Sequence, residues 1–207
     1  MKYEENILEV AALGPDFMGF IFYPGSKRNF DGEIPDLDPS IRKIGVFVNE
    51  DPEQVVEMVR KHDLAGVQLH GEEDAAYCKG LRETLDKPGD FFLIKAFRLK
   101  DSIDFDSLLP YEGHCSCFLF DTLGAERGGT GEKFNWEALK GYKLSTPYLL
   151  SGGIGPDDLR SLERFLGSEG ATSCLGVDVN SRFEVSPGWK NTEKLKIFVN
   201  EFKALKR

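Results

Sequence analysis

Short apolar runs that alternate with amphipathic stretches constrain the fold of this chain more than any other feature. Seven runs have the length and composition of buried strands, and they cover residues 17–23, 43–48, 66–70, 91–97, 117–121, 148–151 and 175–179. Helical patterns occupy residues 4–13, 52–62, 72–85, 134–142, 156–166 and 191–206. The alternation predicts repeated strand–helix units around a parallel sheet. The proline-rich link 24–40 should be mostly irregular.

Composition limits the classes of partner and the number of domains. The chain has 207 residues, which suits a single domain spanning 1–207, and a net charge of −9. A negative field repels nucleic acids and anionic membrane surfaces, so we expect neither as a partner. The four cysteines form no metal-ligand or redox motif, and the sequence contains no membrane-length apolar run. We therefore expect free thiols, no metal and a cytoplasmic location.

The count of strands predicts an unusual version of a common α/β architecture. Seven units after an initial helix make a (β/α)8 TIM-barrel type fold with the first strand missing, and the seam between 17–23 and 175–179 should be open. Exposed strand edges there would favour self-association. An open doubly wound sheet is the alternative, but its glycine fingerprint is not found after an early strand.

Polar residues collect at the predicted strand ends, which is where such barrels carry their chemistry. Asp121 ends an apolar strand, so it suits a general acid, or it caps the following turn. His70 ends the third strand and either faces a ligand or satisfies neighbouring backbone. Arg28 follows the first strand, and it either binds a carboxylate through its planar fork or is an ordinary solvated charge.

Two glycine-rich segments are candidates for phosphate binding. Gly128 and Gly129 lie in a stretch, GGTG, that suits a loop folding over a ligand. Gly152 and Gly153 follow the sixth strand, and their amides could meet a phosphate together with the turn near Ser181. The alternative reading of the second pair is that the glycines serve only as turn residues.

Taken together, the strand-end motifs resemble the phosphoribosylanthranilate isomerases of tryptophan biosynthesis. The matching segments run in order through most of the chain: MGFIFYPGSKR, IGVFVNE, GVQLHGEE, LIKAF, FDTLGAERGGTGEKFNW, LLSGGI and GVDVNSRFEVSPGWK. Each segment is weak evidence alone, whereas seven in the correct order and spacing form a specific signal. There are three alternatives. Two are enzymes of the same barrel class, namely indole-glycerol phosphate synthase or a different sugar-phosphate isomerase. The third is a non-catalytic barrel that binds a phosphorylated ligand.

The resemblance implies an aldose–ketose isomerase, that is, an intramolecular oxidoreductase, which needs no cofactor. Its reaction is the Amadori rearrangement of N-(5-phosphoribosyl)anthranilate to 1-(2-carboxyphenylamino)-1-deoxyribulose 5-phosphate. By this resemblance Asp121 is the general acid that protonates the furanose oxygen, Arg28 holds the anthranilate carboxylate and His70 lines the site. The same resemblance puts Gly152, Gly153, Asp178 and Ser181 around the phosphate of this small phosphorylated substrate.

The resemblance also implies a general base that the printed sequence lacks. Family members open with a strand ending in Lys-x-Cys-Gly, whose cysteine removes the C2 proton, and Met1 aligns directly after that motif. We hypothesise that Met1 is an internal methionine, and that turnover of the chain as printed is strongly impaired. Cys115 and Cys117 should face the barrel interior or its lower end, so neither is placed to act as the base.

Overall fold

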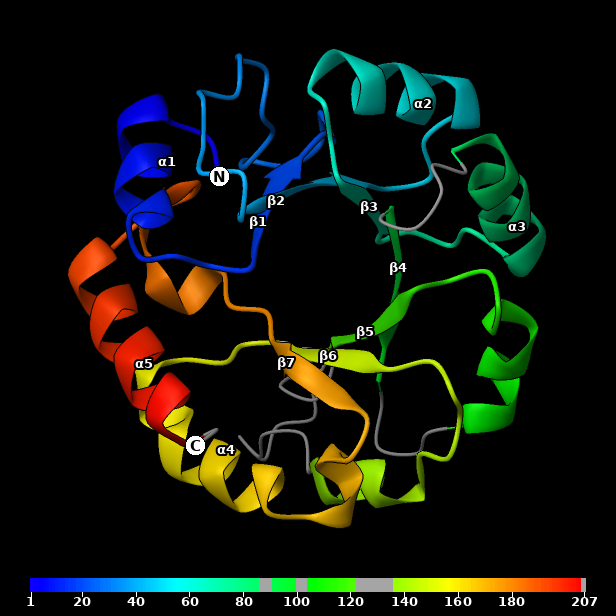
Figure 1. The fold of residues 1–207 in the computed structure, drawn as a ribbon, viewed down its shortest axis with the longest axis vertical. Coiled ribbons are helices and arrows are strands. Elements are labelled where there is room, and N and C mark those ends of the chain that lie inside the picture. The colour runs from blue at the N-terminus through cyan, green and yellow to red at the C-terminus, as the bar shows by residue number, and fades with distance from the viewer. Residues whose placement is uncertain (86–90, 100–103, 122–135, 206–207) are drawn as a thin grey trace.

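A curled sheet of parallel strands forms the centre of the molecule. The computed structural model describes residues 1–85, 91–99, 104–121 and 136–205. Within them, seven strands pair in sequence order, each parallel to the next. These are β1 (Phe17–Ile21), β2 (Arg42–Phe47), β3 (Gly66–Leu69), β4 (Phe92–Arg98), β5 (Cys117–Asp121), β6 (Tyr148–Ser151) and β7 (Cys174–Val177). Figure 1 shows the strands lining a ring with the helices outside it.

The seven predicted strands are confirmed, and their observed bounds differ by only one or two residues. Each is a short run of apolar side chains bounded by polar residues, prolines or glycines, and it is covered on both faces as parallel strands require. The link 24–40 is irregular, as predicted. Sequence alone did not predict the small antiparallel hairpin of β8 (Glu184–Ser186) and β9 (Trp189–Lys190).

Helices cover the outer face of the sheet. The α-helices are α1 (Glu4–Ala11), α2 (Pro52–Lys61), α3 (Ala75–Thr84), α4 (Leu159–Leu166) and α5 (Thr192–Leu205), and 3₁₀ helices are η1 (Phe105–Tyr111), η3 (Trp136–Gly141), η4 (Pro156–Asp158), η5 (Glu169–Ala171) and η6 (Ser181–Phe183). Asp51 caps α2 through the Glu53 amide at 2.9 Å, and Pro52 occupies the first turn, where an N–H is not needed. The stretch predicted as a helix at 134–142 is a 3₁₀ helix over its described part.

The two faces of the sheet bury different clusters of side chains. A small inner cluster consists of Ile44, Ile94, Ala96, Cys117, Leu119 and Leu149. The larger cluster joins the outward-facing strand residues, such as Phe118 and Phe120, to the apolar faces of the helices. Because side chains alternate along a strand, Asp121 shares the inward parity of Cys117 and Leu119. The β5 strand thereby places Asp121 at the rim of the barrel interior.

The predicted open seam is confirmed. In the described part of the chain β1 and β7 are the two ends of the sheet. On the outer edge of β1, the Gly19 carbonyl accepts a hydrogen bond from the Met1 amino group at 2.6 Å, and the Ile21 carbonyl accepts one from the Phe30 amide at 2.7 Å. Irregular segments therefore take up part of the β1 edge that an eighth strand would otherwise occupy.

The hairpin and α1 pack together beside this seam. Figure 1 shows the orange segment that follows β7 lying next to α1. The buried Asn6 side chain donates to the Lys190 carbonyl at 3.0 Å and accepts from the Lys190 amide at 2.6 Å, so it pairs with β9 as a strand residue would. This contact ties the first helix to a hairpin more than 180 residues away. Among the described helices, none has the length and apolar character needed to cross a bilayer.

Candidate active site

Four polar residues meet where the parallel strands end. His70 follows β3, Asp121 and Ser151 end β5 and β6, and Asp178 follows β7. Asp121 and Ser151 are partners in the β5–β6 register, and the Ser151 hydroxyl lies 3.0 Å from Asp178 Oδ2. Burial raises the pKa of Asp178, while the Ser151 hydrogen bond and the charge of His70 act in the opposite direction. The structure thus brings the predicted residues His70, Asp121 and Asp178 to one edge, together with Ser151.

Asp121 is held by the sheet rather than by a flexible loop. Its backbone carbonyl accepts a hydrogen bond from the Leu99 amide at 2.9 Å, and its side chain is half-buried. Its negative charge acts on Asp178, so the two carboxyl groups belong to the same site. Residues 122–135 lie outside the described residues, and the predicted ligands Gly128 and Gly129 are among them.

The turn after β6 has a backbone conformation that glycine favours. Gly152 and Gly153 have φ angles of 101° and 66°, which L side chains rarely adopt. The next glycine amide, that of Gly155, donates to the buried Asp158 carboxylate at 2.8 Å. The turn therefore accounts for both glycines structurally. Their role as phosphate ligands stays a prediction.

The turn after β7 lies against the turn after β6. A Cβ built on Gly155 would come within 3.2 Å of the Arg182 guanidinium, so the two backbone segments are close neighbours. Ser181 begins η6 in this second turn and is exposed. The two turns that carry the predicted phosphate residues are therefore neighbours.

Arg28 is fixed by an ion pair that spans the seam. Its Nε lies 2.9 Å from both carboxylate oxygens of Glu184, and its Nη2 lies 2.6 Å from Oε2. The Lys190 ammonium lies 2.9 Å from Glu184 Oε1, and it also donates to the side chain and carbonyl of Asn180. The reading of Arg28 as an ordinary solvated charge is therefore wrong, whereas the neighbouring Lys27 is exposed.

This ionic cluster shifts the pKa of each of its members. Burial alone would raise the pKa of Glu184, but hydrogen bonds from Arg28 and Lys190 outweigh it and bring the pKa to about 2. The Glu184 hydrogen bond raises the pKa of Arg28. Burial lowers the pKa of Lys190, against the effects of Glu184 and Asp178. Because the charges of Asp178, Glu184 and Arg28 all act on Lys190, the cluster adjoins the rim of strand ends.

Sequence reasoning did not assign roles to Glu184 and Lys190. Both lie in FEVSPGWK, on either side of a turn, and nothing in their spacing tells which distant side chain they meet. The available signal was the pair of opposite charges flanking the Pro-Gly turn after the last strand. Those charges and the turn indicate a hairpin, but they do not indicate that Glu184 of this hairpin contacts Arg28.

The four cysteines, all of them described, form no disulfide and lie away from the rim. Cys117 faces the inner cluster near the start of β5, as predicted. Cys115 precedes β5, at the lower end of the strands, where it packs in the outer cluster beside Cys78 of α3; of the two predicted positions it has the lower end and not the interior. Cys174 begins β7, at the opposite end from Asp178. Among the described residues, no group of three or more His, Cys, Asp or Glu has the arrangement of a metal site.

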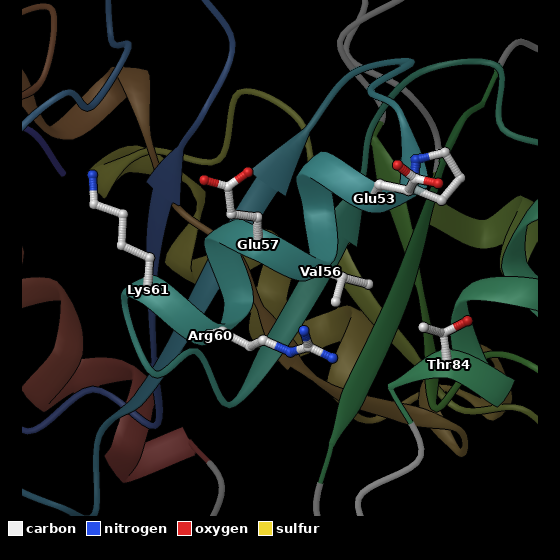
Figure 2. A pocket seen from close by; sticks show the side chains of 7 residues that line it. Glu53, Val56, Glu57, Arg60, Lys61 and Thr84 are labelled. Atoms are coloured by element: carbon white, nitrogen blue, oxygen red, sulfur yellow. The ribbon is translucent and has the colours of Figure 1, made fainter.

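A surface hollow on the outside of the barrel is separate from this rim. Figure 2 shows it beside α2, with the Arg60 side chain extending along it and Thr84 of α3 opposite. The lining residues are Pro52, Glu53, Val56, Glu57, Arg60, Lys61 and Thr84. None of the predicted site residues lines it.

Comparison with known proteins agrees with this architecture. The family model described as N-(5'-phosphoribosyl)anthranilate (PRA) isomerase matches residues 1–201. The chain belongs to the PRA isomerase family. An N-(5'-phosphoribosyl)anthranilate isomerase from Parabacteroides distasonis is 41% identical over 97% of this chain and 90% of the relative.

Solved structures of PRA isomerases have the same fold. The enzyme from Thermotoga maritima is 31% identical and superposes with a TM-score of 0.80, covering 99% of this chain and 96% of the other. Another PRA isomerase structure, 28% identical with a TM-score of 0.75, covers 99% of this chain and 95% of the other. That structure contains reduced 1-(o-carboxyphenylamino)-1-deoxyribulose 5-phosphate. The PRA isomerase barrel is thus the architecture that positions the rim described above.

Proposed function

We propose that this chain carries the PRA isomerase site for the Amadori rearrangement of N-(5-phosphoribosyl)anthranilate in tryptophan biosynthesis. The observation that carries the proposal is the convergence of Asp121, His70 and Asp178 on one rim in a member of this family. The cationic Arg28 joins them from across the seam through the Glu184 and Lys190 cluster. Such a rim offers an acid, an imidazole and a binding group for a carboxylate.

The proposed steps use these groups in order. Asp121 protonates the furanose ring oxygen, so that the C1–O bond breaks and the anthranilate nitrogen forms a Schiff base with C1. Removal of the C2 proton then gives an enol, which becomes the ketose. By the family resemblance, a cysteine in a Lys-x-Cys-Gly motif removes that proton. Arg28 binds the anthranilate carboxylate, and Gly152, Gly153 and Ser181 bind the phosphate.

A steady-state isomerisation assay tests the proposal with two proteins. One is the printed chain, and the other carries an apolar strand ending in Lys-x-Cys-Gly before Met1. We expect the extended protein to be faster by about 10²- to 10⁴-fold, because a general base typically contributes that factor. Failure of the extended protein to convert the substrate would contradict the proposed function.

The role of Asp121 is tested in the extended protein by Asp121→Asn. We expect a loss of about 10²- to 10⁴-fold in kcat, because the amide cannot protonate the ring oxygen. Asp63→Asn is the matched control: Asp63 is exposed and precedes β3, at the opposite end of the strands. Equal activity of the two variants would contradict the assignment of Asp121 as the acid.

Two further expectations are part of the proposal. We propose a cytoplasmic location, which the four cysteine thiols outside any disulfide support. Self-association through the open edges of β1 and β7 also remains a proposal. One solved structure is described as that of monomers of the dimeric PRA isomerase from Thermotoga maritima, and dimerisation is there a property of that enzyme. Analytical ultracentrifugation of this chain with and without the added strand tests whether the seam is the interface, because filling the seam should then abolish association.

A further inference from the structure

The contacts of Arg28 divide its guanidinium into two edges. The Nε and one N–H of Nη2 face the Glu184 carboxylate, at distances of 2.6 to 2.9 Å. An arginine has five N–H groups in a rigid plane, so the Nη1 amino group and the second Nη2 hydrogen lie on the other edge. That edge has the fork geometry that binds a second carboxylate. Binding a substrate carboxylate there would not require breaking the Glu184 pair.

Glu184 is itself held in place on several sides. Its side chain is 5% exposed, and Oε1 accepts from the Lys190 ammonium at 2.9 Å and from the Gly188 amide at 3.1 Å. Lys190 is anchored in turn by Asn180, and its backbone is paired with Asn6 of α1. The carboxylate is therefore fixed by the hairpin and by α1, whereas Arg28 comes from the loop after β1.

We propose that Glu184 is a positioning residue that holds Arg28 across the open seam, so that the free edge of its guanidinium recognises the carboxylate of the substrate. The inference rests on the proposed function, which supplies a substrate with an aromatic carboxylate. Glu184 does not touch the substrate in this arrangement. It sets the direction of the Arg28 fork, and Lys190 balances the charge of Glu184 so that it does not repel the incoming carboxylate.

Isothermal titration calorimetry of the printed chain with two ligands tests the inference. One ligand is reduced 1-(o-carboxyphenylamino)-1-deoxyribulose 5-phosphate, and the other is the same compound without its carboxyl group. For the wild-type chain we expect the first ligand to bind at least about tenfold more tightly, because hydrogen bonds to charged groups are worth that much. If the wild type binds neither ligand, the proposed function itself fails, and this inference fails with it.

The decisive variant is Glu184→Gln. We expect the preference for the carboxylate ligand to fall to about twofold or less, because Arg28 is no longer held by two charged contacts, while the affinity for the carboxyl-free ligand changes little. An equal loss for both ligands would show a merely structural role and overturn the inference. Tighter binding of the carboxylate ligand would show that Glu184 competes with the substrate for Arg28, and would also overturn it.

Two further variants keep the result interpretable. Arg28→Lys retains the positive charge but lacks the planar fork, so we expect the same loss of carboxylate preference with Glu184 intact. If Glu184→Gln does not fold, retention of the full preference by Arg28→Lys overturns the inference. Glu193→Gln, at an exposed position on α5, is the matched control and should leave both affinities unchanged.

Discussion

A buried ion pair behind the rim gives the sharpest prediction about stability. Lys95 of β4 and Glu73 before α3 are only 3% and 1% exposed, and their Nζ and Oε2 atoms lie 3.2 Å apart. Lys95 Nζ also donates to the carbonyls of Gly71 at 2.8 Å and Ala96 at 3.0 Å. Glu73 accepts from the amides of Asn49 at 2.8 Å and Gly71 at 3.0 Å. The pair therefore joins the middle of β4 to the segments that follow β2 and β3, next to His70.

The perturbation is Glu73→Gln, and its magnitude follows from these contacts. Three donors converge on the Glu73 carboxylate, whereas glutamine offers one acceptor oxygen and adds an N–H₂ group. At least one buried donor is left unpaired, which costs about 1–3 kcal/mol. The Lys95 ammonium also loses its counter-charge in a dry environment. Removing one partner of a buried ion pair typically costs about 3–5 kcal/mol in total, and we expect that loss here.

Urea denaturation of four proteins measures this effect: the wild type, Glu73→Gln, Lys95→Met and the double variant. Because each single change leaves a buried charge unpaired, the double variant should lose less stability than the two single losses combined. We expect the loss in the double variant to be smaller than the sum of the two single losses by about 0.5–3 kcal/mol. The control is the exposed pair of Lys140 and Glu137 on η3, whose side chains are 49% and 54% exposed. Glu137→Gln should change stability by less than about 1 kcal/mol.

Two results would refute the reasoning. A loss below about 1 kcal/mol for Glu73→Gln would mean that water or backbone movement compensates for the missing charge. Strict additivity of the two single changes would mean that Glu73 and Lys95 do not interact energetically. The difference between Glu73→Gln and Glu137→Gln is decisive because the chemical change is the same and only burial differs.

Three shorter predictions follow from other parts of the structure. The pKa of Glu184 is lowered from its ordinary value of 4.5 to about 2. Its ion pairs therefore stabilise the fold fully above pH 4.5, and this stabilisation is lost as the pH falls toward 2. In acid unfolding, Glu184→Gln should make stability depend less on pH in this range. Gly153→Ala should destabilise by about 1–2 kcal/mol in urea because its φ is 66°, whereas Gly80→Ala, inside α3 with open space around it, should stabilise by about 0.5–1 kcal/mol. Phe120→Ala should cost about 3–5 kcal/mol because the ring is fully buried, and an unchanged melting midpoint would contradict that packing.

Local patterns were sufficient to predict the sheet and the strand-end acid. An apolar run such as 117–121, set among helical patterns, is typical of a strand buried on both faces of a parallel sheet, and Asp121 stands where that run ends. The inward parity of Asp121 follows from the same alternation. The seven strands and their order around the barrel could therefore be derived without coordinates.

Contacts between distant segments needed the tertiary structure. Arg28 meets Glu184 across 156 positions, and Asn6 pairs with Lys190 across 184. No periodicity encodes such meetings, because they depend on how far the sheet curls and on which turn lies opposite which. The sequence by itself determined which residues reach the rim, since strand geometry is local. Only the tertiary structure decided which of them share a hydrogen bond, since such pairing depends on how the curled sheet brings the segments on the two sides of its open seam together.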